Sequence, residues 1–183
     1  MSARESGMSP LIEVEVEDEA WVAALPDFEA VVVGAAAAAL KMPSPLVGEG
    51  GEKDAGVGPA TILLTDDATV RDLNARFRGK DYATNVLSFP AAAQPGLAGP
   101  QPLGDLALAY GICAAEAAAQ GKTLADHLRH LVAHGVLHLL GHDHEDDAEA
   151  EAMEALERRI LAGLGVADPY GAEVMSEAGA GHV

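Results

Sequence analysis

The chain has 183 residues, of which 49% are hydrophobic and 22% are charged. This length fits one domain with a sizeable core, and the composition excludes a wholly disordered or collagen-like protein. Eleven basic and 29 acidic residues give a formal net charge of −18, which disfavours general electrostatic binding to nucleic acid. The single cysteine, Cys113, excludes an internal disulfide framework and a cysteine-based zinc site.

The longest apolar run covers residues 30–40 and is too short for a helix that spans a membrane. The acidic N-terminal region also lacks the basic and then apolar order of a secretory signal. We therefore expect a cytoplasmic protein with no membrane partner.

The first half of the chain predicts two strands and two helices. Alternating apolar and acidic residues at 12–17 indicate a half-buried strand, and an apolar stretch from Pro26 to Lys41 indicates a helix with proline in its first turn. Two prolines and five glycines at 43–58 predict a surface loop within the domain. A short strand at 61–64 then precedes a helix, capped by Thr65 or Asp66, with apolar residues at helical spacing.

The second half predicts two more strands and then mostly helix. The strands are expected at 85–89 and 106–110, separated by a loop that begins at Pro90, and the helices at about 112–120, 123–140 and 147–161. Short strands that alternate with helices indicate one α+β or α/β domain at residues 11–165. Residues 1–10 are expected to be a flexible N-terminus and residues 166–183 a flexible tail.

Six of the seven histidines lie between His127 and His144. His134 and His138 are four residues apart, so their imidazoles can reach one metal ion from one face of a helix. Gly141 supplies a residue that commonly ends a helix, which lets the chain turn back and bring His144 to the same ion. Three histidine ligands with a fourth position open are typical of catalytic zinc.

Alternatives remain for the metal and for the third ligand. Imidazole also suits nickel, copper and iron, so zinc is a preference among several transition metals. His142 competes with His144 as the third ligand, and we expect it to lie at the rim of the site. His127 and His130 are expected to be buried or to support the ligands through hydrogen bonds.

Two families of proteins share this histidine spacing. The metzincin proteases read His-Glu-x-x-His-x-x-Gly-x-x-His, and this chain matches that pattern except that Gly135 replaces the glutamate. That glutamate is the general base that activates water for peptide hydrolysis, and glycine has no side chain to accept a proton. A metallopeptidase of this type would lack its base.

The second resemblance covers more of the chain. His134 to His144 resembles the His-Gly-x-Leu-His-Leu-x-Gly-x-Asp-His motif of the YbeY family, bacterial metal-dependent endoribonucleases of ribosomal RNA maturation and ribosome quality control. Residues 78–90, which read RGKDYATNVLSFP, and 103–106, which read LGDL, are similar to two further blocks of that family. The chain departs from the family at His142, where an aromatic residue is usual.

The resemblance implies an α+β fold with a small mixed four-stranded sheet packed by helices, and a metal held by His134, His138 and His144 on a helix and the turn after it. It also implies an important arginine at Arg78, whose planar guanidinium suits the negative charge that develops on a phosphate. The function expected is single-strand-directed, metal-dependent cleavage of RNA in the processing of the 16S ribosomal RNA 3′ end. The small ribosomal subunit or its proteins are the expected partners, and DNA is not.

Two questions remain open at this stage. Arg71, Arg76 and Lys80 surround Arg78 in the sequence, and they fit RNA contacts and ordinary surface charge equally well. The strongly acidic composition also suits a different function, a non-catalytic, metal-stabilised assembly factor that docks on basic ribosomal proteins.

Overall fold

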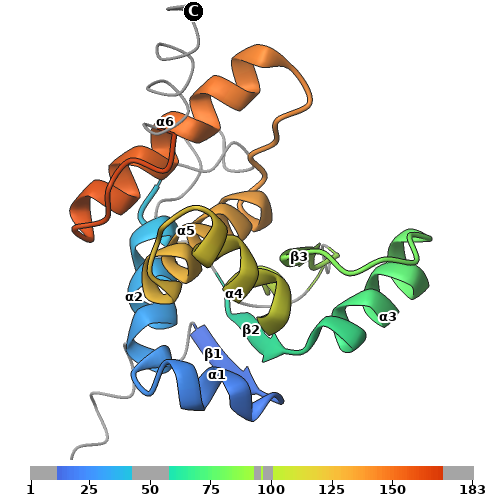
Figure 1. Cartoon of the computed structure of the whole chain (residues 1–183). Helices are drawn as coiled ribbons and strands as arrows, with labels where there is room; N and C mark the ends of the chain where they lie inside the picture. The colour runs from blue at the N-terminus through green and yellow to red at the C-terminus, as the bar shows by residue number, and fades with distance from the viewer. Residues whose placement is uncertain (1–11, 43–57, 93–95, 97–100, 171–183) are drawn as a thin grey trace, which may run out of the picture.

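The computed structural model describes residues 12–42, 58–92, 96 and 101–170 (Figure 1). In chain order, the elements of these residues are β1 (Ile12–Val16), α1 (Glu19–Ala24), α2 (Phe28–Leu40), β2 (Ala60–Thr65), α3 (Asp67–Arg78), β3 (Val86–Pro90), β4 (Gly104–Ala109), α4 (Tyr110–Ala119), α5 (Leu124–Leu139) and α6 (Asp147–Gly163). Of the helices in this described part, none is both long and apolar enough to cross a membrane.

The four strands form one mixed sheet in the order β1-β2-β4-β3. Strands β1, β2 and β4 are parallel, and β3 pairs with β4 in the antiparallel direction, which makes β3 an edge strand. This arrangement confirms the predicted α+β domain with a small mixed four-stranded sheet.

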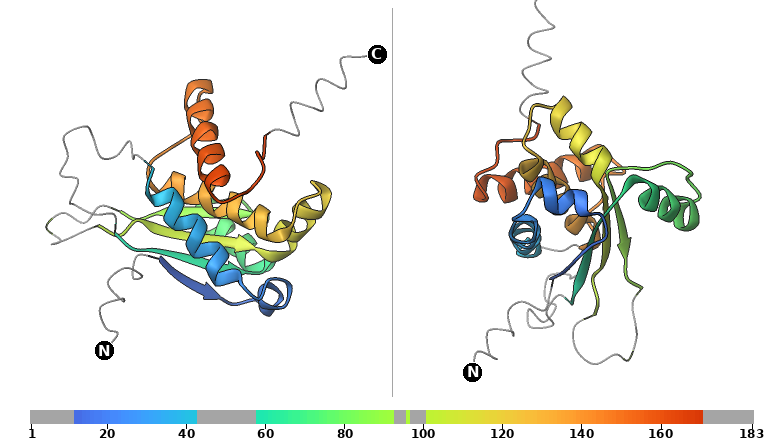
Figure 2. Two further views of the ribbon diagram at one scale, coloured as in Figure 1. Left: turned by 90° about the vertical axis from the view of Figure 1, so that its left-hand side faces the viewer. Right: turned by 60° about the horizontal axis from the view of Figure 1, so that its bottom comes forward.

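The helices cover the two faces of the sheet unequally. Helices α2 and α5 lie over one face, and α3 lies on the other (Figure 2). Strand side chains alternate between the faces, so Leu106 and Leu108 enter the larger core, whereas Ala107 and Leu87 pack with Val70 of α3. Both cores are closed by buried apolar side chains, and the larger core also takes in residues of α6.

Helix α5 packs tightly against the sheet at Gly135. A Cβ atom at this position would lie 2.8 Å from both methyl carbons of Leu106, which is itself buried in β4. Thr123 caps the start of the helix, and its hydroxyl accepts a hydrogen bond from the Asp126 amide at 3.1 Å. It ends before Gly141, whose φ of 101° is favourable only for glycine, as the sequence predicted.

The largest difference from the predicted elements is helix α1, which the sequence patterns did not indicate. Asp18 caps it by accepting a hydrogen bond from the Ala20 amide, and Trp21 anchors it in the core, where its indole N–H donates to the Thr65 carbonyl at 2.9 Å. Pro26 lies before the N-cap residue of α2 and not in its first turn. The predicted fourth strand also ends one residue too late, because Tyr110 already begins α4, and it starts two residues after Gly104, where β4 begins.

Several predicted segments fall partly or wholly outside the described residues. The predicted N-terminal segment 1–10, residues 43–57 of the predicted loop and residues 171–183 of the predicted tail are among them. Residues 166–170 of the predicted tail are described, and there Asp168 and Tyr170 contact α6 through Arg158 and Glu157.

We predict that Gly135→Glu lowers the free energy of unfolding by at least about 3 kcal/mol, because a carboxylate would be forced between α5 and Leu106. Gly34→Glu is the matched control, since a Cβ atom at this helical glycine meets nothing within 4 Å. Urea unfolding of both variants measures the difference, and equal stabilities would contradict the packing described at Gly135.

Candidate metal centre

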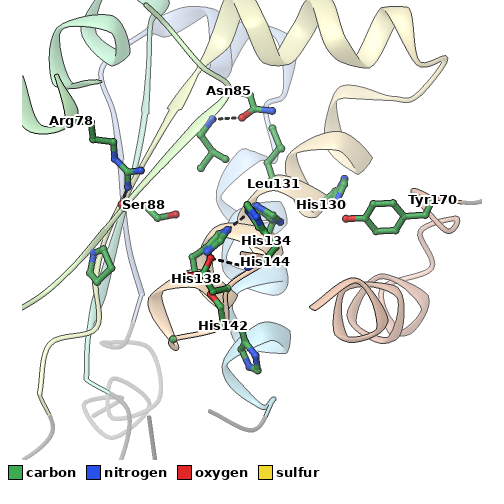
Figure 3. A pocket seen from close by; sticks show the side chains of 14 residues that line it. Arg78, Asn85, Ser88, His130, Leu131, His134, His138, His142, His144 and Tyr170 are labelled. Carbon is green, nitrogen blue, oxygen red and sulfur yellow. Dashed lines mark hydrogen bonds between the residues drawn. The ribbon is translucent and has the colours of Figure 1, made fainter. Parts of the chain in front are cut away.

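A cavity of about 680 Å³ opens between the edge strand β3 and the C-terminal end of α5 (Figure 3). One wall consists of β3 side chains and of Arg78, which arrives from the end of α3. The opposite wall consists of histidines from α5 and from the turn that follows it. Residues from four separate segments of the chain therefore meet at this cavity: Arg78, residues 85–90, residues 130–144 and Tyr170.

His134, His138 and His144 come together at the base of the cavity, and one nitrogen atom of each lies within 4.8 Å of the other two. His134 and His138 are partly buried on α5, and His144 is exposed on the turn after Gly141. Three imidazoles in this arrangement could hold one metal ion. His142 also lines the cavity but is not a member of this cluster.

The hydrogen bonds of the rings orient their free nitrogens toward one point. His138 Nδ1 lies 3.1 Å from the carbonyl oxygen of His142, which only accepts, so Nδ1 carries the hydrogen. His134 Nδ1 bonds to the Glu157 carboxylate in the same way. Each Nε2 is then left with a lone pair, and the two Nε2 atoms face one another at 3.1 Å. Two facing lone pairs repel unless a cation lies between them, so the donor set fits a metal ion.

The electrostatic surroundings keep His138 in the form that binds a metal. Burial, together with the neighbouring imidazoles of His134 and His144, lowers the pKa of His138 to about 4. The ring is therefore neutral at pH 7, and no proton has to leave before a metal ion binds.

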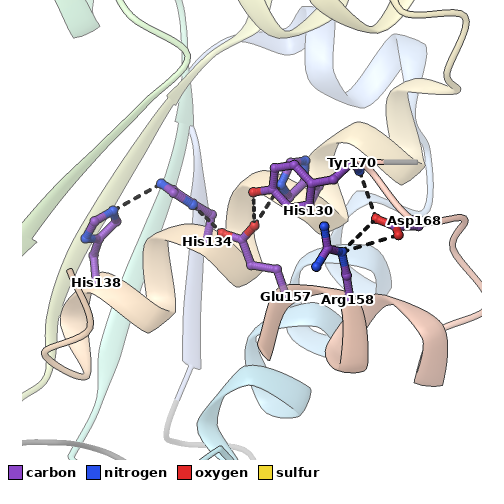
Figure 4. Close-up of polar contacts among 7 residues, drawn as sticks. All are labelled: His130, His134, His138, Glu157, Arg158, Asp168 and Tyr170. Carbon is purple, nitrogen blue, oxygen red and sulfur yellow. Dashed lines mark hydrogen bonds and ion pairs between the residues drawn. The ribbon is translucent and has the colours of Figure 1, made fainter. Parts of the chain in front are cut away.

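Glu157 is the fully buried carboxylate behind this cluster (Figure 4). It accepts hydrogen bonds from His134 Nδ1, from His130 Nε2 at 3.3 Å and from the hydroxyl of Tyr170. Burial alone would raise the pKa of this carboxyl, but the hydrogen bonds from His130 and His134 lower it to about 2. Glu157 is therefore an anion that fixes the ring of His134. It also makes the free nitrogen of that ring more basic, and so a stronger ligand for a metal ion.

Tyr170 connects the end of the described chain to the cavity. Its ring lies edge-on to His130, and the guanidinium carbon of Arg158 lies 5.2 Å from its ring centroid. Arg158 in turn pairs with Asp168 at 3.3 Å. These contacts hold the Tyr170 hydroxyl against Glu157 on the wall of the cavity.

The other α5 histidines do not join the cluster. His127 is buried near the start of α5, and its Nε2 lies 2.9 Å from the Glu116 carboxylate. His130 lines the cavity and is bonded to Glu157. Both positions agree with the expectation that these residues are buried or support the ligands.

Arg78 lies across the cavity from the histidines (Figure 3). Its Nη2 donates a hydrogen bond to the backbone carbonyl of Ser88. By contrast, Arg71 is engaged with Asp81 at 2.9 Å and Arg76 with Asp72 at 3.3 Å, both on the exposed surface. Among these three arginines, Arg78 is the one that lines the cavity and has no carboxylate partner in the described part of the chain.

Glu157 and Tyr170 were not identified as site residues from the sequence. Glu157 belongs to a helix rich in acidic residues, and nothing was predicted for it individually. A signal was nevertheless present, because Glu157 shares the buried face of α6 with Met153, Ile160 and Leu161. A carboxylate in register with an apolar helix face requires a buried partner. Tyr170 carried no comparable signal.

Comparison with known proteins places the chain in a family. A sequence model described as "Endoribonuclease YbeY" matches residues 50–165. The chain belongs to the YbeY family. A protein of Azorhizobium caulinodans named endoribonuclease YbeY is 55% identical over 87% of this chain and 95% of its own length. A protein of the same name from Paramagnetospirillum magneticum is 52% identical over 87% of this chain and 95% of its own length. One from Alkalilimnicola ehrlichii is 51% identical over 88% of this chain and 93% of its own length.

A solution structure of a Thermotoga maritima protein is also similar, at 21% sequence identity and a TM-score of 0.47, over 84% of this chain and 91% of that one. The YbeY family assignment confirms the resemblance seen in the His134–His144 motif. The residues that carry this motif are those that meet at the cavity.

We predict that Glu157→Gln weakens metal binding by about 10- to 100-fold, because the anion that supports His134 is lost. Glu116→Gln is the matched control: it removes a carboxylate from His127, which lies outside the cluster. Competition with a chromogenic chelator measures the dissociation constants of both folded variants for zinc. Equal constants in Glu157→Gln and the parent would show that Glu157 does not support the metal centre.

Proposed function

We propose that this protein is a metal-dependent endoribonuclease that cleaves single-stranded RNA. The observation that carries the proposal is the shared cavity, where the guanidinium of Arg78 lies opposite the cluster of His134, His138 and His144. A phosphodiester in this cavity would meet a cationic, bidentate donor on one side and a metal site on the other. The names of the curated relatives support the same activity.

The resident metal is proposed to be one zinc ion per chain, held by the three histidines. Three neutral nitrogen ligands that leave a fourth position open are the donor set of catalytic zinc, although other transition metals also accept imidazole. Such an ion supplies a Lewis acid and a water molecule of lowered pKa. Glu157 and the His142 carbonyl hold the rings of His134 and His138 so that their Nε2 atoms face the ion.

Arg78 is proposed to bind the scissile phosphate and to stabilise the negative charge that develops on it. Its hydrogen bond to the Ser88 carbonyl holds the side chain over the cavity while it keeps further N–H donors. Fixed donors of this kind stabilise the transition state because they need no rearrangement during the reaction.

The biological role proposed from the family is maturation of ribosomal RNA, including the 3′ end of 16S RNA, and ribosome quality control in the cytoplasm. The small ribosomal subunit or its proteins would be the partners. A net charge of −18 suits contacts with basic ribosomal proteins, and it also supports a second candidate function, a non-catalytic assembly factor with a structural metal.

The peptidase alternative has less support than either of these. At Gly135, where metzincin proteases have their glutamate, a side chain would run into Leu106 and not into the cavity. The packing of α5 on the sheet therefore leaves no room for a general base at that position.

Removal of the metal should abolish cleavage of single-stranded RNA by the highly purified protein, and zinc should restore it. His138→Ala should lose most of the metal, because two ligands bind far more weakly than three. His142→Ala is the matched control and should keep metal and activity, since His142 contacts His138 through a backbone carbonyl that alanine retains. Elemental analysis and gel assays measure both. Full metal occupancy in His138→Ala would contradict the ligand set, and cleavage without metal would contradict the mechanism.

Arg78→Ala should lower the single-turnover rate at saturating RNA by about 100-fold or more, with a much smaller change in RNA affinity. Arg71→Ala is the control, because this arginine is exposed and already paired with Asp81. If Arg78→Ala cleaves at the parent rate once it is saturated with RNA, Arg78 is a docking residue and not a catalytic one.

A further inference from the structure

A pair of aromatic rings, one of them exposed, lies on the side of β3 that faces away from the cavity. Phe77, in the last turn of α3, is 67% exposed. Its ring packs edge-to-face on that of Phe89 in β3, with the centroids 5.6 Å apart and the planes at 67°. Phe89 packs against the smaller core, which contains Leu87, whereas most of Phe77 is exposed to solvent.

The aromatic pair is connected to the cavity across the edge of the sheet. Val86, Ser88 and Pro90 of β3 line the cavity, whereas Leu87 and Phe89 belong to the α3 side. Arg78 spans both sides: its guanidinium carbon lies 5.6 Å from the Phe89 centroid, and its Nη2 bonds to the Ser88 carbonyl. Because β3 pairs only with β4, no further strand of the described sheet separates the two sides.

The surroundings of Phe77 favour a nucleic-acid ligand. Arg78 follows it in the last turn of α3 and Lys80 lies just after the helix, in a chain that is otherwise strongly acidic, whereas its other neighbour Arg76 is paired with Asp72. Tyr82 is also exposed, but it lies in a separate hollow with Arg71 and Asp81. One exposed aromatic ring next to two cationic residues is too small for a protein interface of ordinary size, but it fits one base and its neighbouring phosphates. Bases stack on aromatic side chains with little regard to sequence, since every base has a π-face.

We propose that Phe77, backed by Phe89, is a stacking site for one unpaired RNA base, whose neighbouring phosphate lies at Arg78 in the cavity. The proposal rests on the proposed function, because it takes RNA as the substrate. In a duplex both faces of a base are covered by its stacked neighbours, so this site accepts only bases outside a helix. Stacking at Phe77 thus gives the protein its preference for single strands.

The test measures binding, independently of cleavage. A fluorescent 2′-O-methyl oligonucleotide is titrated with the zinc-loaded protein, and a gel checks that it stays intact. Phe77→Ala should weaken binding by about 5- to 100-fold, as expected for the loss of one stacked base. Phe77→Trp should bind like the parent, whereas Phe77→Leu should resemble alanine, which separates aromatic stacking from general hydrophobicity. Val22→Ala, an exposed aliphatic control on α1, should change nothing.

Abasic substitutions locate the base. In a series of oligonucleotides with one abasic residue each, one position should weaken binding to the parent and have no effect on Phe77→Ala. If Phe77→Ala binds every oligonucleotide as the parent does, the stacking site is wrong while the cleavage function is untouched. If binding depends on Phe77 and on one base as described, but the parent protein cleaves no RNA, the stacking site stands and the proposed nuclease function fails.

Discussion

The close packing of α5 on β4 at Gly135 determines where the rest of the site can lie. A residue with a side chain at this position would push the helix away from Leu106 and out of the core. With glycine there, one face of α5 is buried against the sheet, and His134 and His138 emerge at the margin of that face, partly buried beside the edge strand β3. Gly135 stands where a metzincin peptidase has its general base. The fold itself therefore requires glycine at this position.

A buried anion joins the distant parts of the chain to this helix. Glu157 is stable as a carboxylate only because donors from His130, His134 and Tyr170 surround it, and burial without them would be costly. The same bonds tie α6 and the segment after it to α5. Packing of α6 and orientation of the His134 ring thus depend on one side chain, so folding of the C-terminal part and order in the site are coupled.

Local patterns predicted most of the elements. The histidine spacing predicted that His134 and His138 meet a third histidine, with His144 preferred to His142, and the structure brings these three rings together. Gly141 ends α5 as expected because its positive φ is a local requirement. The patterns did not predict α1, since a six-residue helix has little periodicity and is held by Trp21 through a bond to Thr65, 44 residues away. The face of α6 indicated that Glu157 is buried, but not which groups it meets, because its partners come from other parts of the chain and only the three-dimensional fold brings them to it.

The net charge of −18 limits how the proposed RNA substrate could bind. Arg71 and Arg76 are engaged with Asp81 and Asp72, so the basic window of the sequence does not act as a broad positive surface. Under the proposals made above, attraction for RNA would be confined to Arg78, the candidate metal site and the exposed ring of Phe77, all close to the edge strand β3. Such a small site gains little from long-range electrostatic attraction, because the negative net charge of the protein repels RNA at a distance. On the same proposals, single strands would be distinguished from duplexes by local geometry: the RNA would have to bend over β3 with one base unstacked, which a duplex cannot do.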